Sequence, residues 1–257
     1  MPTQDPRRVV VFGVASEESI AWHVAQGLKA KGAAVYLGYQ QRFRSRVLQL
    51  VKGASPAPDA LYRCDLTSDV ELDELARAVG GPVDGLVHSV AFAPPSSFAK
   101  RIDEIDGEEF AQALVASAHS LLRLARATRD ILAPEANLIT MTYIGAQRVV
   151  PGYRLMGIAK AALEAAVREL AVELGPRGVR VNAISAGPIR TLSARAVPRF
   201  DEMREQYGRM VPLRRCVEGT DVADVADFLL SPASRSITGQ VIYVDGGFSI
   251  MSVPDRM

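Results

Sequence analysis

Short β-branched runs alternate with longer stretches of helical period along most of the chain. The apolar runs lie at residues 7–14, 33–39, 59–66, 83–90, 136–143, 178–185 and 240–247. This alternation is typical of a parallel sheet that helices cover on both faces. The pattern predicts an α/β protein with a doubly wound parallel sheet of about seven strands.

Helical periodicity fills the intervals between these runs. Ile20, Val24 and Leu28 mark one face of a first helix, and further helices are expected over residues 68–80, 108–132, 153–175 and 220–231. In the last of these, Thr220 is the expected N-cap, and Asp221 suits the positive end of the helix. Because no internal repeat or linker divides the chain, residues 1–257 are expected to form one domain.

Two long segments, residues 92–107 and 187–215, fit this alternation poorly. Each follows the carboxyl end of a predicted strand, where ligands bind in sheets of this kind. Long connections in a compact α/β domain are often functional lids, although surface insertions also take this form. We favour the interpretation that both segments cover a substrate.

Composition and charge exclude several classes of partner. The 257 residues are 48% hydrophobic and 23% charged, and 30 basic against 29 acidic side chains leave a net charge of +1. No bulk field attracts nucleic acid or an anionic membrane, and no apolar run is long enough for membrane insertion. Cys64 and Cys216 are too few and too far apart for a disulfide framework or a metal site. A cytoplasmic location is therefore expected.

The first strand runs into GVASEESIAW at residues 13–22, where a phosphate-binding turn is expected if the sheet binds a nucleotide. Gly13 is followed six residues later by Ser19 at the predicted start of a helix. A helix N-terminus presents unpaired N–H groups, and a serine there can cap the helix or donate to a pyrophosphate oxygen. A lone glycine fits an unliganded turn equally well.

The ends of the second and third strands carry further candidate residues. Gln40 stands where NAD-specific folds often place an acid on the ribose hydroxyls. Arg42, Arg44 and Arg46 follow and either receive a 2′-phosphate or form a solvated helix face. Asp65 can hydrogen-bond an adenine amino group or cap the next helix.

The stretch GYRLMGIAK at residues 152–160 places a tyrosine and a lysine seven residues apart. Helical periodicity predicts Tyr153 and Lys160 on one face, about 10 Å apart along the axis. A buried tyrosine and a snorkelling lysine would be the purely structural interpretation. However, Gly157 costs about 1 kcal/mol relative to alanine inside a helix, so another group is expected to approach its backbone. The preceding strand brings Tyr143 to the same end of the sheet.

These residues resemble those of the short-chain dehydrogenases/reductases, and within that superfamily the bacterial enoyl-(acyl-carrier-protein) reductases of type II fatty acid synthesis. The resemblance rests on the Gly-x5-Ser turn, on HSVAFAP at residues 88–94, on VRVNAISAGPIRTL at 179–192 and on GQVIYVDGGFSIM at 239–251. Most members of the superfamily carry Tyr-x3-Lys, an upstream serine and an Asn-Ala-Gly motif. This chain has Tyr153-x6-Lys160, with Tyr143 in place of the serine and HSVA in place of Asn-Ala-Gly, as the enoyl reductase branch does.

The resemblance implies a Rossmann-like fold and the reduction of trans-2-enoyl thioesters by a nicotinamide cofactor. It implies Tyr153, Lys160 and Tyr143 as catalytic candidates, with Lys160 on the nicotinamide ribose. The cofactor-binding residues that it implies are Gly13, Ser19, Ile20, Gln40, Asp65, Leu66, Ser89, Val90, Lys160, Ile189, Thr191 and Leu192. The implied substrate-binding residues are Ala91, Phe92, Ala93, Tyr143, Tyr153, Met156, Ala194 and Phe200.

The same resemblance implies NADH as the cofactor through Gln40, while the neighbouring arginines leave NADPH open. It implies an acyl carrier protein as the partner that carries the substrate, and a homotetramer. No metal is expected. Two other functions stay open: a reductase of the same fold that acts on a carbonyl or another activated alkene, and a regulator that binds a dinucleotide without turnover.

Overall fold

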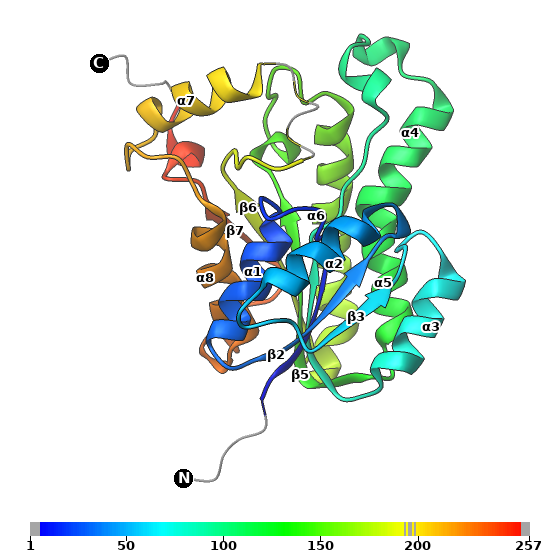
Figure 1. Ribbon diagram of the computed structural model, residues 1–257. Coiled ribbons are helices and arrows are strands. Elements are labelled where there is room, and N and C mark those ends of the chain that lie inside the picture. The colour runs from blue at the N-terminus through cyan, green and yellow to red at the C-terminus, as the bar shows by residue number, and fades with distance from the viewer. Residues whose placement is uncertain (1–5, 193, 195–196, 198, 253–257) are drawn as a thin grey trace.

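The computed structural model describes residues 6–192, 194, 197 and 199–252. Its centre is a seven-stranded sheet in the order β3-β2-β1-β4-β5-β6-β7, in which every neighbouring pair is parallel (Figure 1). The strands are β1 (Arg8–Phe12), β2 (Ala34–Tyr39), β3 (Ala60–Arg63), β4 (Val83–His88), β5 (Leu132–Thr142), β6 (Arg180–Ala186) and β7 (Val241–Val244). The predicted doubly wound, Rossmann-like sheet is confirmed. Its strand order reverses between β1 and β4, which is the switch point where such sheets bind ligands.

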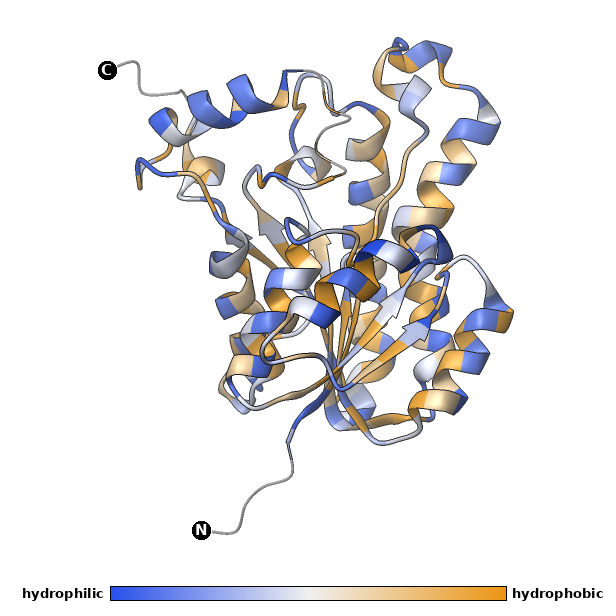
Figure 2. Cartoon of the chain, viewed as in Figure 1, coloured by the Kyte–Doolittle hydropathy of each residue, from blue (hydrophilic) through white to orange (hydrophobic). Residues whose placement is uncertain are grey.

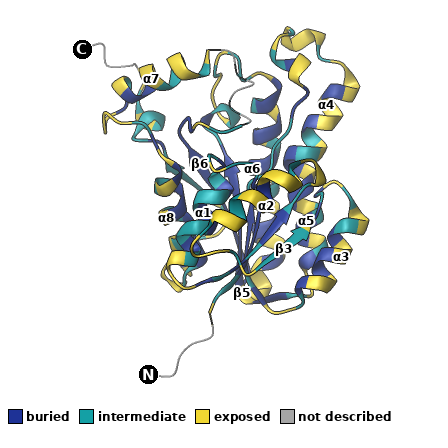
Figure 3. Cartoon of the chain, in the orientation of Figure 1, coloured by how far each residue is buried: buried dark blue, intermediate teal, exposed yellow. Residues whose placement is uncertain are grey.

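Helices cover both faces of the sheet. They are α1 (Ile20–Ala30), α2 (Arg44–Gly53), α3 (Asp69–Val79), α4 (Gly107–Leu114), α5 (Ser120–Thr128), α6 (Leu155–Leu174), α7 (Phe200–Met210) and α8 (Gly219–Leu230). Alternate residues of β1 point to opposite faces, so Val9 and Val11 pack under α1, α2 and α8, while Val10 and Phe12 pack under α3, α5 and α6. The central strands are accordingly apolar and buried, the edge strands β3 and β7 are partly buried, and the polar sides of the helices face outward (Figures 2 and 3). Among the described residues, no helix combines the length and the apolar character that a membrane span requires.

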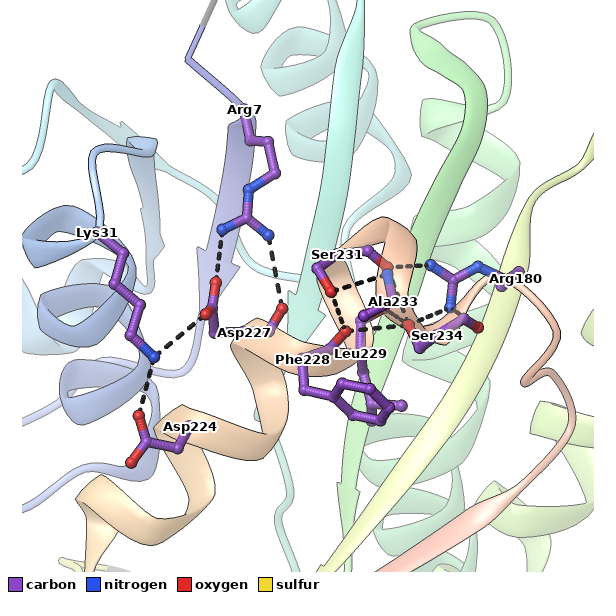
Figure 4. Close-up of polar contacts among 10 residues, drawn as sticks. All are labelled: Arg7, Lys31, Arg180, Asp224, Asp227, Phe228, Leu229, Ser231, Ala233 and Ser234. Atoms are coloured by element: carbon purple, nitrogen blue, oxygen red, sulfur yellow. Dashed lines mark hydrogen bonds and ion pairs between the residues drawn. The ribbon is translucent and has the colours of Figure 1, made fainter.

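Polar contacts fix α8 at the amino-terminal edge of the sheet (Figure 4). Arg7, directly before β1, and Lys31, after α1, both pair with Asp227 on α8. Arg180, the first residue of β6, is buried and donates to the carbonyl and the hydroxyl of Ser234, both at 2.8 Å.

Three helix predictions need correction. Thr220 is not the N-cap of α8, because Glu218 caps the helix and its own N–H donates to the carboxylate of Asp221 at 2.9 Å. The predicted helix over 108–132 is divided by a π-helical turn at Val115–His119 and ends at Thr128. The predicted helix over 153–175 begins only at Leu155, because Arg154 has a φ of 44° that leaves Tyr153 in the preceding turn. Tyr153 and Lys160 therefore do not share one continuous helix.

The two poorly fitting segments lie beyond the carboxyl ends of the strands. Residues 92–107 contain two short 3-10 turns, Pro95–Phe98 and Ile102–Glu104, and residues 187–215 contain α7. Figure 1 shows α4 and α7 rising past this edge of the sheet. A small apolar cluster of Ala93, Ala113, Leu155, Met156 and Ala159 packs the first segment and α4 against α6. Residues 193, 195, 196 and 198 of the second segment lie outside the described residues.

Candidate active site

A cavity of about 370 Å³ opens where the strands end. The predicted site residues that line it are Gly13, Ser19, Ile20, Ser89, Val90, Ala91, Phe92, Ala93, Tyr143, Tyr153, Met156, Lys160, Ile189, Thr191, Leu192, Ala194 and Phe200. They come from five separate parts of the chain, and the strand order brings them together. Gln40, Asp65 and Leu66 do not line this cavity, since they follow β2 and β3 at the outer part of the sheet, and Leu66 is buried in the core.

Several lining residues carried no signal in the sequence. Met141 and Thr142 close β5, and Val150 lies three residues before Tyr153. Their residue types are ordinary for a buried strand or a helix. Only the spatial order of the strands reveals that they face the cavity.

The β1–α1 turn packs directly on the end of β4. Gly13 has a φ of 106°, and a Cβ atom at this position would lie 2.1 Å from the carbonyl oxygen of Ser89. Only glycine combines that backbone conformation with so close an approach. The turn therefore brings the start of α1 against the end of β4, both of which line the cavity.

Ser19 organises the turn rather than the helix. It precedes α1 but makes no capping hydrogen bond, because its Oγ accepts from the backbone N–H groups of Ala15 and Ser16, both at 3.0 Å. Ser19 thus holds the N-cap position without a side-chain cap, and its hydroxyl hydrogen is still available to donate to a ligand. Within the described part of the chain, the Ser16 hydroxyl is buried without a hydrogen-bond partner.

Gln40, Arg42 and Asp65 form one polar cluster at the ends of β2 and β3. The Gln40 side chain accepts from Arg42 Nε at 2.9 Å and donates to Asp65 Oδ2 at 3.3 Å. The Arg42 guanidinium also lies over the rings of Phe43 and Phe92, at 4.7 and 5.8 Å from their centroids. Arg42 thus faces the cluster.

Three other residues near this cluster are placed by the structure. Arg44 and Arg46 lie on the exposed face of α2. Asp65 does not cap α3, because its Oδ1 accepts from the Thr67 N–H and hydroxyl, while Ser68 caps the helix. The Asp65 carboxylate is held beside Gln40, and contacts with Thr67 and Gln40 keep its pKa below the usual value despite partial burial.

Tyr143 and Tyr153 meet in the cavity wall. Their rings are 4.9 Å apart in an edge-to-face arrangement. Burial raises the pKa of both phenols, that of Tyr143 to about 12, so both are protonated at neutral pH. A Cβ atom at Gly157 would lie 2.7 Å from the carbonyl oxygen of Gly145, which confirms the expected close approach to the α6 backbone.

Lys160 is buried in the same wall, with 6% of its surface exposed. Its ammonium group donates to the carbonyl oxygen of Met141 at 2.7 Å. Burial lowers the pKa of Lys160 to about 8, although the charge of Glu164 opposes that shift. An ammonium with one backbone partner has two N–H donors left for a ligand.

The π-helical turn and α5 hold the segment that follows β4 in place. His88 Nε2 lies 2.8 Å from the Ser120 hydroxyl, and His88 Nδ1 lies 2.9 Å from that of Thr140. Burial lowers the pKa of His88 to about 3, so the ring is neutral and its two hydrogen bonds are structural. The Ser117 hydroxyl binds both the N–H and the C=O of Phe92 at 3.1 Å. These contacts fix residues 88–92 beside the cavity.

The residues present fit a dinucleotide. The start of α1 offers N–H groups to a pyrophosphate, and the buried Ser16 hydroxyl beside it lacks a partner. The Gly13 turn leaves no room for a side chain, and the free donors of Lys160 suit ribose hydroxyls. For a metal ion, the described residues hold no group of three or more potential ligands.

Comparison with known proteins agrees with this geometry. Residues 13–249 match the family described as enoyl-(acyl carrier protein) reductase. The NADH-dependent enoyl-(acyl-carrier-protein) reductase of Synechocystis is 41% identical over 254 residues, covering 96% of this chain and 98% of that protein. The corresponding Escherichia coli enzyme is 40% identical over 252 residues, covering 96% and 95%.

Solved structures give the same result. The Bacillus cereus enoyl-acyl carrier protein reductase, crystallised with NADP+ and indole naphthyridinone, superposes with a TM-score of 0.93 at 38% identity and covers 96% of this chain and 98% of its own. The Anaplasma phagocytophilum enzyme in complex with NAD has a TM-score of 0.90 at 33% identity, covering 97% and 94%. A family match over most of the residues, identities of about 40% across the whole fold and this shared architecture show that the chain belongs to the enoyl-(acyl-carrier-protein) reductase family.

Proposed function

We propose that this protein reduces the C2=C3 double bond of trans-2-enoyl thioesters with NADH, the last step of the fatty acid elongation cycle. The observation that carries the proposal is one apolar-walled cavity that holds a protonated Tyr153 and a buried Lys160. Membership of the enoyl-(acyl-carrier-protein) reductase family and the NADH-dependent relatives support the same reaction.

The cofactor is held along the carboxyl edge of the sheet. The pyrophosphate binds at the start of α1, beside Gly13, Ser19 and Ile20. The adenosine binds beside Gln40 and Asp65, whereas Leu66, which is buried in the core, supports this part of the site from within. Ser89, Val90, Lys160, Ile189, Thr191 and Leu192 line the remaining path, and all six contribute to the cavity wall. A bound reduced nicotinamide supplies the hydride that goes to C3 of the substrate.

Tyr153 stabilises the charge that develops on the substrate. Hydride addition at C3 places negative charge on the carbonyl oxygen at C1, two carbons away, so the hydrogen-bond donor must stand farther from the hydride than a ketone reductase requires. The six-residue spacing, with Tyr153 in the turn before α6, supports that offset. The high pKa keeps its hydroxyl protonated and able to donate. A preorganised donor of this kind is worth about 10²–10³-fold in rate.

The other residues of the site bind the cofactor, orient the substrate and cover it. Lys160 holds the nicotinamide ribose and its charge favours the enolate, whereas Tyr143 lines the substrate pocket beside the thioester. Protonation of the enolate at C2 completes the reduction. Residues 92–107 and 187–215 cover the substrate, a role that the position of Phe92, Ala93, Ala194 and Phe200 in the cavity wall supports.

The acyl carrier protein that bears the enoyl thioester is the proposed partner, and the cytoplasm is the proposed location. We propose a homotetramer as the assembled state. Partly exposed apolar side chains support an interface on α4, the adjoining turn, α5 and α6: Phe110, Val115, Leu122 and Ile158 have 37–41% of their surfaces exposed.

The test is to measure oxidation of NADH and of NADPH in parallel, with a trans-2-enoyl thioester or a matched 3-ketoacyl thioester. Rapid turnover of the enoyl substrate alone, weakened about 10²-fold or more in Tyr153→Phe, is the expected result. Turnover of the ketone would instead favour a carbonyl reductase of the same fold. Tight cofactor binding without turnover on either substrate would favour a regulator.

The spacing of the donor has its own test. The double variant Tyr153→Phe with Met156→Tyr moves the phenol to the Tyr-x3-Lys spacing of ketone reductases, and Tyr153→Phe alone is the matched control. Enoyl reduction should stay as low in the double variant as in the control. Undiminished enoyl reduction in the double variant would contradict the geometric explanation.

A further inference from the structure

Glu164 is a buried carboxylate that no step of the proposed reaction uses. It has 5% of its surface exposed and follows Lys160 by four residues on the buried side of α6, about 6 Å farther along the axis. Its Oε1 accepts from the Thr142 hydroxyl at 2.8 Å, and its Oε2 accepts from Gln147 Nε2 at 3.2 Å. Because an amide N–H group can only donate, Oε2 faces Gln147 as an acceptor, and the carboxylate form satisfies both contacts.

The contacts of Glu164 and Lys160 converge on the end of β5. Lys160 binds the carbonyl of Met141, and Glu164 binds the side chain of the next residue, Thr142. Tyr143, which follows, stands in the cavity wall. Two ionic side chains of α6 thus hold consecutive residues directly before a tyrosine of the site.

The hydrogen bonds of Glu164 extend to the loop after β5 and to β7. Gln147 donates to Glu164, and the hydroxyl of Tyr243 on β7 donates to Gln147 Oε1 at 2.7 Å. This loop includes Gly145, whose carbonyl oxygen lies against the backbone of Gly157. Gly145 also packs against the ring of Tyr153, so a substitution at position 164 is expected to affect the backbone that supports this ring.

Glu164 is the charged group that acts on Lys160, because the other titratable groups around it are neutral. From β4, His88 is neutral, because burial lowers its pKa to about 3. Tyr143 and Tyr153 are protonated, because burial raises the pKa of both phenols. Tyr243 faces Glu164 from β7 and is protonated as well, since burial and the Glu164 charge raise its pKa. Within the described part of the chain, Glu164 supplies the charge that favours the ammonium form of Lys160 against burial.

We infer that Glu164 is a positioning residue of this active site: its carboxylate keeps Lys160 in the ammonium form and fixes the end of β5 through Thr142 and Gln147. The inference deepens the proposed function and rests on it for the role of Lys160 at the cofactor. It assigns Glu164 no contact with substrate or cofactor.

The test measures NADH binding by nicotinamide fluorescence between pH 6 and pH 10, for wild type, Glu164→Gln, Glu164→Asp and Asp227→Asn. Glu164→Gln removes the charge at nearly constant shape, Glu164→Asp keeps the charge but shortens the reach to Thr142, and Asp227→Asn removes a carboxylate on the far side of the sheet. Binding to the wild type should weaken above about pH 8, where Lys160 loses its proton. In Glu164→Gln this weakening should begin about one to two pH units lower.

The variants separate charge from position. Glu164→Asp should keep the wild-type pH dependence of NADH binding but lose turnover about tenfold, because the end of β5 is no longer held. An unchanged pH dependence in Glu164→Gln, or an equal displacement in Asp227→Asn, would overturn the inference. If Glu164→Gln does not fold, Glu164→Asp decides: a displaced pH dependence despite the retained charge would overturn it. Wild-type protein that binds NADH without reducing an enoyl thioester would refute the proposed function, yet the binding titration would still decide the role of Glu164.

Discussion

Replacing Lys160 with methionine should change the stability of the free protein in a pH-dependent way. The lysine has a pKa of 10.5 as a model group and about 8 in the folded chain, because burial disfavours its charge. A group whose pKa is lowered on folding destabilises the protein fully below its folded pKa, and the cost disappears as the pH rises past its unfolded pKa. This cost is about 3 kcal/mol at pH 7 and about 1 kcal/mol at pH 10.

Methionine has a similar length and no charge, so Lys160→Met removes this cost. The variant also loses the hydrogen bond to Met141, worth about 1 kcal/mol, and leaves Glu164 without its cation. The net gain at pH 7 is therefore below 3 kcal/mol. This gain in stability should fall by about 2 kcal/mol between pH 7 and pH 10. The fall depends on the titration of Lys160 alone, because the lost hydrogen bond does not titrate.

The assay is urea unfolding of both proteins at pH 7 and pH 10, with and without NADH, and with Lys52→Met as a control at an exposed lysine. The stability difference between Lys160→Met and wild type should fall between the two pH values, whereas that of the control should not. NADH should stabilise the wild type far more than Lys160→Met, since a ligand stabilises only the state that binds it. A difference that is the same at both pH values would refute the assignment of a depressed lysine pKa.

Three further substitutions test the geometry of the site. Gly13→Ala should lower the free energy of unfolding by about 1–3 kcal/mol and weaken NADH binding, because its Cβ would lie 2.1 Å from the Ser89 carbonyl; a urea midpoint equal to that of wild type would contradict the tight turn. Gly157→Ala should reduce kcat about 10- to 10²-fold, because the added Cβ displaces the Gly145 carbonyl, although alanine favours a helix. A more stable and fully active variant would show that no group lies close to this backbone. Arg42→Ala should raise the Kd of NADPH about tenfold or more and that of NADH less, as measured by fluorescence titration; equal effects would exclude Arg42 as a partner of a 2′-phosphate.

The architecture was accessible from the sequence because it depends on periodicity. Buried parallel strands require apolar residues on both faces, so the runs around Val9–Val11 and Leu138–Met141 mark the sheet wherever the chain places it. The close approach to Gly157 was accessible for a similar reason, since glycine is costly in a helix interior unless the space is needed. Strand ends and spacing singled out Gly13, Ser19, Gln40, Asp65, Tyr153 and Lys160, whereas their roles and the remaining site residues came from the resemblance to a family.

Local backbone conformations were decided by individual contacts that periodicity does not show. Because Arg154 has a positive φ, α6 begins only at Leu155, after Tyr153, although Tyr153 and Arg154 fit the helical period. Glu218 caps α8 in place of Thr220 because Asp221 reaches back to it, and either assignment fits the bare sequence. The π-helical turn at 115–119 inserts where Ser117 binds the backbone of Phe92, a partner distant in the chain.

The sequence by itself determined which segments are buried and which residue types are available for chemistry, because burial and spacing are properties of the local chain. Only the tertiary structure decided which of these residues meet. Glu164 looks like any glutamate on a helix until β5 and the Gln147 loop are placed against it, and the low pKa of Lys160 arises only when the surrounding elements exclude water. The energetics of a charge depend on its surroundings in space, and that information lies in residues far apart in the sequence.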